Sequence, residues 1–132
     1  MGSLVSDEQA TGKVKEVFDE IRSTMGLVPN FFRALAAVDA EWMELNWMRW
    51  KGIMGRSGSL DRKTKELLAV AAAMLSNSPY VRVVHETLAL KVGASEQDLV
   101  ETKQVVDLFA SFSIIAESLD VPFEAPPESA AR

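Results

Sequence analysis

The sequence has 132 residues, with 19 acidic and 14 basic side chains, a formal net charge of −5 and no cysteine. The length suits one domain with a buried core, and the acidic balance disfavours nucleic acid as a partner, because phosphate binding needs a concentrated basic face. Without cysteine the chain has no disulfide, no zinc–thiolate site and no thiol nucleophile. Its longest apolar run, at 67–75, is shorter than the roughly 20 residues that cross a membrane. The N-terminus lacks the basic-then-apolar pattern of a signal peptide, so we expect a cytoplasmic protein.

Three helices are predicted in the first half of the chain. The capping-box pattern S-D-E-Q predicts a helix that starts at Ser6, carries apolar residues at helical spacing and ends at Gly26. Pro29 then favours an extended residue before a short helix at 31–37. An aspartate suited to capping begins a third helix, at 39–54.

A loop rich in glycine and serine, at 55–59, separates these helices from the second half. A fourth helix is predicted at 60–76, where the sequence N-S-P interrupts it. Ser78 suits the N-cap of a fifth helix and Pro79 its first helical position. That helix ends at Gly93.

Two further helices complete the prediction. Ser95 caps a sixth, and the apolar residues at 105–115 indicate a seventh. The sequence therefore predicts one all-α domain, 1–132, a bundle of six or seven helices with its core at about 7–119. The residues at 120–132 hold three prolines and are predicted to be an extended or disordered tail.

His85 is the one histidine of the chain, and apolar residues share its helical face. The plainest interpretation is a core histidine satisfied by one hydrogen bond. Glu66, however, lies on the apolar face of the preceding helix. Helices joined by a tight turn pack antiparallel, and at ~1.5 Å rise per residue the two side chains differ by about one turn in their distance from the connection. A buried carboxylate beside a buried imidazole is best satisfied by pairing, so we expect a Glu66–His85 pair.

The segment 60–95 reads LDRKTKELLAVAAAMLSNSPYVRVVHETLALKVGAS. It resembles the core motif of the alkylhydroperoxidase-D-like and carboxymuconolactone decarboxylase superfamily. In that motif a glutamate is followed by Cys-x-x-Cys, by a histidine four residues after the second cysteine, and by a glycine that closes the helix. Glu66, His85 and Gly93 match these positions.

A second stretch, G-L-V-P-N at 26–30, is similar to the peroxidase-related branch of this superfamily, and the resemblance covers roughly 12–120. It implies the alkylhydroperoxidase-D-like helical fold. The chain departs from the motif at both cysteines, where it has Ser78 and Val81. This departure decides what function the resemblance implies.

In the peroxidase branch, a helix N-terminus and a His–Glu relay lower the pKa of a thiol and so produce an attacking thiolate. A serine hydroxyl is far less acidic than a thiol, and valine has no proton to donate. Ser78 is a candidate nucleophile activated by His85, but the interpretation as a Ser-Pro helix cap is simpler.

Three functions follow from these residues. The first is a redox-silent family member that acts as an oligomeric binding or assembly module. The second is a cysteine-independent enzyme of the decarboxylase or lactone type, in which His85 moves a proton, Glu66 orients it and N–H groups near Ser78 meet an anionic substrate. The third is a protein that carries the peroxidase label by family but is inactive as one. We favour the first.

The predicted helix at 39–54 carries tryptophans on one face, which is typical of either a bulky core stripe or an interface. Tyr80, Trp47 and Trp50 are the predicted binding residues, for a small-molecule ligand or for a second subunit. The resemblance implies a homo-oligomer, as a dimer, trimer or hexamer. We expect no metal, no cofactor, no nucleic acid and no membrane as partners.

Overall fold

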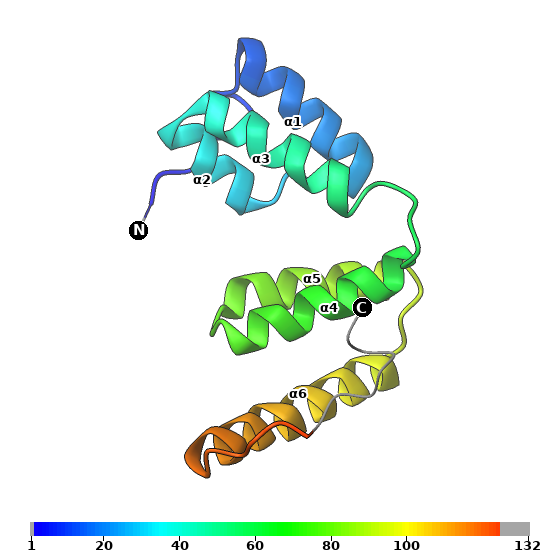
Figure 1. The fold of residues 1–132 in the computed structure, drawn as a ribbon. Coiled ribbons are helices and arrows are strands. Elements are labelled where there is room, and N and C mark those ends of the chain that lie inside the picture. Colours follow the sequence, from blue (N-terminus) through cyan, green and yellow to red (C-terminus); the bar gives the residue numbers. More distant parts are fainter. Residues whose placement is uncertain (1, 125–132) are drawn as a thin grey trace. The chain divides into compact units, whose positions relative to one another are not determined.

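The computed structural model describes residues 2–124, and within them it contains six helices and no strand. The helices are α1 (Gly12–Met25), α2 (Asn30–Val38), α3 (Ala40–Ile53), α4 (Arg62–Leu75), α5 (Pro79–Lys91) and α6 (Glu96–Ser118). The all-α fold predicted from the sequence is confirmed. The chain divides into two compact units, Met1–Gly58 with α1 to α3 and Ser59–Arg132 with α4 to α6 (Figure 1). That the whole chain acts as one domain stays a prediction.

In the first unit, α1 and α2 both contact α3. Gly26 ends α1 with a φ of 85°, a left-handed conformation that glycine adopts without a steric penalty. Asp39 caps α3 as predicted, because its carboxylate accepts from the backbone N–H groups of Glu41 and Trp42. Apolar side chains at helical spacing fill the space between the three helices. These buried residues are Ala10, Val17, Phe18, Ile21, Met25, Val28, Phe32, Leu35, Met43 and Trp47.

The first helix begins at Gly12, so the prediction that it begins at Ser6 is wrong. The capping box itself does form: Gln9 Oε1 accepts from the backbone N–H of Ser6 at 2.9 Å, and Ser6 Oγ accepts from that of Gln9 at 3.2 Å. It closes only a single turn. Thr11 is extended and Gly12 has a φ of 53°, and these two conformations break the helical path before α1 starts.

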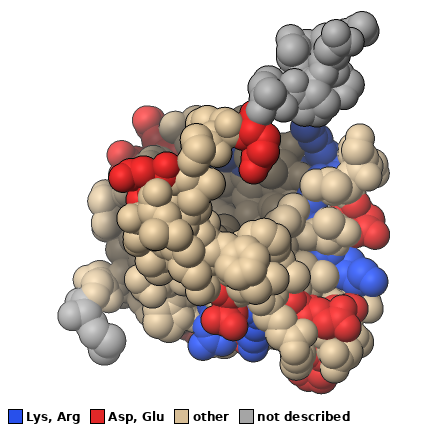
Figure 2. Space-filling view, turned by 60° about the horizontal axis from the view of Figure 1, so that its bottom comes forward, with Lys and Arg blue, Asp and Glu red and all other residues tan. Residues whose placement is uncertain are grey.

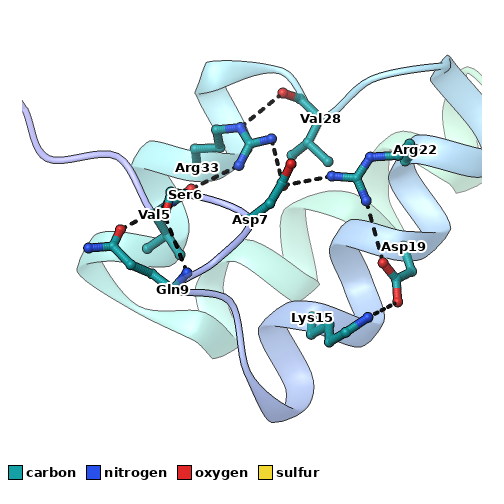
Figure 3. Close-up of polar contacts among 9 residues, drawn as sticks. All are labelled: Val5, Ser6, Asp7, Gln9, Lys15, Asp19, Arg22, Val28 and Arg33. Carbon is teal, nitrogen blue, oxygen red and sulfur yellow. Dashed lines mark hydrogen bonds and ion pairs between the residues drawn. The ribbon is translucent and has the colours of Figure 1, made fainter.

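Asp7 attaches the N-terminal segment to α1 and α2 (Figure 3). Its Oδ1 accepts from Arg22 Nη2 at 2.6 Å and from Arg33 Nη2 at 2.8 Å. Arg33 also donates to the backbone carbonyls of Val5, at 3.0 Å, and Val28, at 3.3 Å. The hydrogen bond from Arg33 is the largest cause that lowers the pKa of Asp7 below its ordinary value.

In the second unit, α4 and α5 lie side by side and are joined by a tight turn, and α6 contacts α4 (Figure 1). Asn77 in the turn has a φ of 52°, which asparagine tolerates better than most residues. Ser95 and Asp98 form a complete capping box at the start of α6, as predicted. The buried apolar residues are Val70, Ala89, Ala94 and Leu99.

One continuous helix, α6, replaces the sixth and seventh helices predicted from the sequence. The residues from Glu96 to Ser118 include neither glycine nor proline, so nothing in this segment interrupts the backbone hydrogen bonds. The apolar residues at 105–115 therefore continue the helix that starts after Ser95.

Residues 121–124 form neither helix nor strand, and the rest of the predicted tail, 125–132, lies outside the described residues. No helix in the described part of the chain combines the length and the hydropathy that crossing a membrane requires.

Candidate active site on helices α4 and α5

Glu66 is the centre of the candidate site. It projects from the second turn of α4, and its side chain is fully buried. Oε1 accepts from Arg62 Nε at 2.8 Å, and Oε2 lies 2.5 Å from His85 Nδ1. The predicted pairing of Glu66 with His85 is confirmed. Both carboxylate oxygens have partners, which is the condition under which a buried acidic group is tolerated.

His85 lies on α5 with its side chain 16% exposed. A carboxylate accepts hydrogen bonds and donates none, so Nδ1 carries the hydrogen that joins the ring to Glu66. In the neutral ring this leaves the lone pair on Nε2. The arrangement fixes one tautomer and orients the ring, as the carboxylate of a catalytic triad does. Proton transfer at Nε2 is the chemistry that this geometry can perform.

Ser78 caps α5, and its Oγ accepts from the backbone N–H of Val81 at 3.3 Å. The predicted Ser-Pro cap is therefore confirmed, with Pro79 at the first helical position. Within residues 2–124 no hydrogen bond joins Ser78 to His85. Tyr80 follows in the first turn of α5 with its side chain exposed. The structure thus brings Glu66 and His85 together, while Ser78 and Tyr80 lie at the N-terminal end of α5.

Trp47 and Trp50 belong to the first unit. Trp47 is buried, with its ring edge-on to Phe32 at a centroid distance of 5.6 Å and stacked on Trp50 at 5.2 Å. Trp42, on the same helix, is exposed. The binding role expected of Trp47 and Trp50 stays a prediction, and the packing of Trp47 is that of a core residue.

Glu86, the residue after His85, forms ion pairs with two basic side chains. Oε1 accepts from Arg82 Nη1 at 2.9 Å and from Lys103 Nζ at 2.8 Å, so the group joins α5 to α6. Burial acts to raise the pKa of Glu86, but Lys103 and Arg82 outweigh it, and the pKa is lowered. Glu86 therefore has a structural role, as the acidic partner of two ion pairs. Among the described residues no group of three or more His, Cys, Asp or Glu side chains could hold a metal ion.

The sequence profile of the carboxymuconolactone decarboxylase family matches residues 29–121, which include both helices of the site. This chain belongs to the carboxymuconolactone decarboxylase family. The structure is also similar to the crystal structure of the alkylhydroperoxidase AhpD core from Rhodospirillum rubrum. The TM-score is 0.88 and the identity 26%, over 94% of this chain and 93% of that one. A search of curated proteins found no match to this chain.

These comparisons confirm the resemblance to the alkylhydroperoxidase-D-like and carboxymuconolactone decarboxylase superfamily. The family match includes Glu66, Ser78, Val81 and His85, but the comparisons do not assign a role to any of them.

Sequence reasoning missed Arg62, which donates to Glu66 from one turn earlier on α4. The available indication was its position four residues before a buried glutamate, a spacing at which helical side chains meet. Arg62 donates to Oε1 of Glu66, so Oε2 is available to His85.

Proposed function

We propose that this chain is a redox-silent member of the carboxymuconolactone decarboxylase family that acts as an oligomeric binding or assembly module. The observation that carries the proposal is that the chain has no cysteine. The resemblance implies that Ser78 and Val81 stand where the motif has its two cysteines. Ser78 serves as the cap of α5. Peroxide reduction by a thiol needs a sulfur that forms a sulfenic acid and then a disulfide, and methionine does not cycle in this way without repair enzymes.

Apolar side chains on the surface support the assembly part of the proposal. Along α6 only Leu99 is buried, while large apolar residues in its C-terminal half are exposed. A contiguous apolar patch of more than a few hundred Å² is rarely left exposed by a soluble protein. Symmetric self-association is the common way to cover such a patch.

The purified protein should reduce no organic hydroperoxide above background when a dithiol or a disulfide reductase supplies electrons. Turnover is followed as loss of hydroperoxide, after removal of contaminating metals. The matched control is the double variant Ser78→Cys/Val81→Cys, which restores both thiols within the first turn of α5. A thiol at a helix N-terminus has a lowered pKa, so this variant should gain thiol reactivity. Sustained turnover by the wild type would contradict the proposal.

A second candidate function is acid–base chemistry without cysteine, and the hydrogen bond between His85 Nδ1 and Glu66 favours it. In this alternative, Nε2 of His85 takes a proton from the substrate, and Glu66 stabilises the imidazolium that forms. The imidazolium then returns the proton to carbon, either to the carbanion left when CO2 departs from a carboxylic acid or to the enolate of a lactone. The backbone N–H groups at the start of α5 would meet an anionic substrate.

If this second function holds, wild type should turn over one member of a panel of lactones and β-keto acids. His85→Gln should then lower kcat by roughly a hundredfold or more, the usual contribution of a positioned acid–base group. The pH profile of kcat/KM should lose the limb that reports the histidine. Equal rates for wild type and His85→Gln on every substrate would exclude this function and leave the binding module.

A further inference from the structure

The C-terminal half of α6 carries an apolar stripe that the second unit leaves exposed. Five residues, spaced alternately three and four apart, share one face of the helix. They are Val105, Leu108, Phe112, Ile115 and Leu119, referred to below as the α6 seam, and their exposed fractions lie between 45% and 69%. Phe109 lies at the edge of the seam, with its ring edge-on to that of Phe112 at 5.9 Å. Alternating spacings of three and four residues are the pattern of a helix that packs along another helix.

The seam faces away from the helices against which α6 packs. Three apolar residues that are buried or half-buried, Leu99, Val106 and Ala110, share a different side of α6. At 3.6 residues per turn, the centre of the seam lies about 160° around the helix axis from that side. Neither α4 nor α5 therefore covers the seam.

The ion pairs that attach α6 to its unit lie before the seam. Asp98 pairs with Lys63 of α4 at 3.9 Å, and Lys103 pairs with Glu86 of α5 at 2.8 Å. From residue 104 to residue 119 the only charged side chains are Asp107 and Glu117. In Figure 2, the side of the molecule that carries α6 faces the viewer, and uncharged residues make up much of it. A strongly charged partner would find few complementary groups along this half of the helix.

We propose that the α6 seam is the surface through which two copies of this chain associate, helix against helix. The inference deepens the proposed assembly function and rests on it. A second copy fits because an apolar seam complements itself about a two-fold axis, where residue i of one copy contacts residue j of the other and j contacts i, so apolar side chains meet apolar side chains.

The amount of apolar surface on the seam suits a stable dimer. With aromatic side chains of about 150–250 Å² each and aliphatic ones of roughly half that size, the half-exposed seam and its neighbour Phe109 offer about 500 Å² per chain. A standard interface buries about 800 Å² per partner, of which rather more than half is apolar. The seam thus supplies the apolar part of one standard interface.

The test is the molar mass of the full chain by sedimentation or light scattering at micromolar concentration. Wild type should be a dimer or a multiple of one. Phe112→Glu would bury a charge in the centre of the interface and should weaken association about a hundredfold or more. The matched control is Ile114→Glu: Ile114 is 68% exposed on the same helix but lies nine residues after Val105, on the opposite side. This variant should associate as wild type does.

Because the chain lacks cysteine, crosslinking provides a second readout that does not introduce a charge. Single cysteines at positions 108, 112 and 115 should yield a disulfide-linked dimer at one seam position at least, whereas Ile114→Cys should not. An oligomer that Phe112→Glu leaves intact, or that Ile114→Glu disrupts equally, would overturn the seam and leave the assembly function standing. A monomeric wild type would overturn both, while the hydroperoxide assay would still test redox silence independently.

Discussion

Glu66 is the one polar or charged residue buried among residues 2–124, and its two oxygens hold Arg62 and His85. The position of Glu66 satisfies two requirements. A buried carboxylate needs hydrogen-bond donors, and a histidine that transfers protons needs a fixed tautomer. The same two contacts meet both, so this residue matters for stability whether or not the site is catalytic.

Glu66→Ala should lower the free energy of unfolding by about 1–3 kcal/mol, because it leaves the half-buried imidazole of His85 without its carboxylate acceptor. Glu66→Gln should cost less, since the amide oxygen still accepts one hydrogen bond. Urea unfolding followed by circular dichroism measures both.

The control for these variants is Glu101→Ala, at an exposed position on α6 in the same unit. It should change the free energy of unfolding by no more than about 0.5 kcal/mol. Equal losses in Glu66→Ala and Glu101→Ala would show that the buried hydrogen bonds do not stabilise the unit.

At the scale of elements, Asp7 joins the N-terminal segment to α1 and α2 through Arg22 and Arg33. Its pKa lies below the ordinary 3.8, first because of the hydrogen bond from Arg33 and further because of the attraction to Arg22. A carboxylate whose pKa is lower in the folded state stabilises the fold above its unfolded pKa. That contribution is lost as the pH falls through the folded pKa.

Asp7→Asn should therefore lower Tm near pH 7, and the difference from wild type should shrink as the pH falls below about 4. Thermal unfolding at several pH values measures this. Asp107→Asn is the matched control: Asp107 is exposed, and none of the ion pairs in the described part of the chain involves it. A difference from wild type that stays constant with pH would show that the charge of Asp7 is not what holds the segment.

Most of the elements could be predicted from local patterns. The caps at Asp39, Ser78 and Ser95 form as predicted, because a cap depends on residues within one turn. Two boundaries were wrong for equally local reasons. The capping box at Ser6 closes a single turn before Gly12 breaks the path, and α6 runs on because its interior contains no helix-breaking residue.

At the scale of the whole molecule, the family match extends over residues 29–121 and so includes parts of both units. The aromatic residues of α3 are divided between the core and the surface of the first unit. Trp47 is enclosed with Phe32 and Trp50 in the core of the first unit, while Trp42 on the same helix is exposed. The large apolar residues of α6 are exposed in the second unit, and the expected subunit contact at α3 stays a prediction.

The sequence by itself determined the helical class, the caps, the absence of cysteine and the pairing of Glu66 with His85. Each of these depends on composition or on residues whose separation is set by helix geometry and one short turn. Only the tertiary structure decided that Arg62 completes the site, that Trp47 lies in a core and that the α6 seam is exposed. The physical reason is that an apolar side chain at helical spacing is equally suited to a core or an interface, and the elements packed against it decide which it joins.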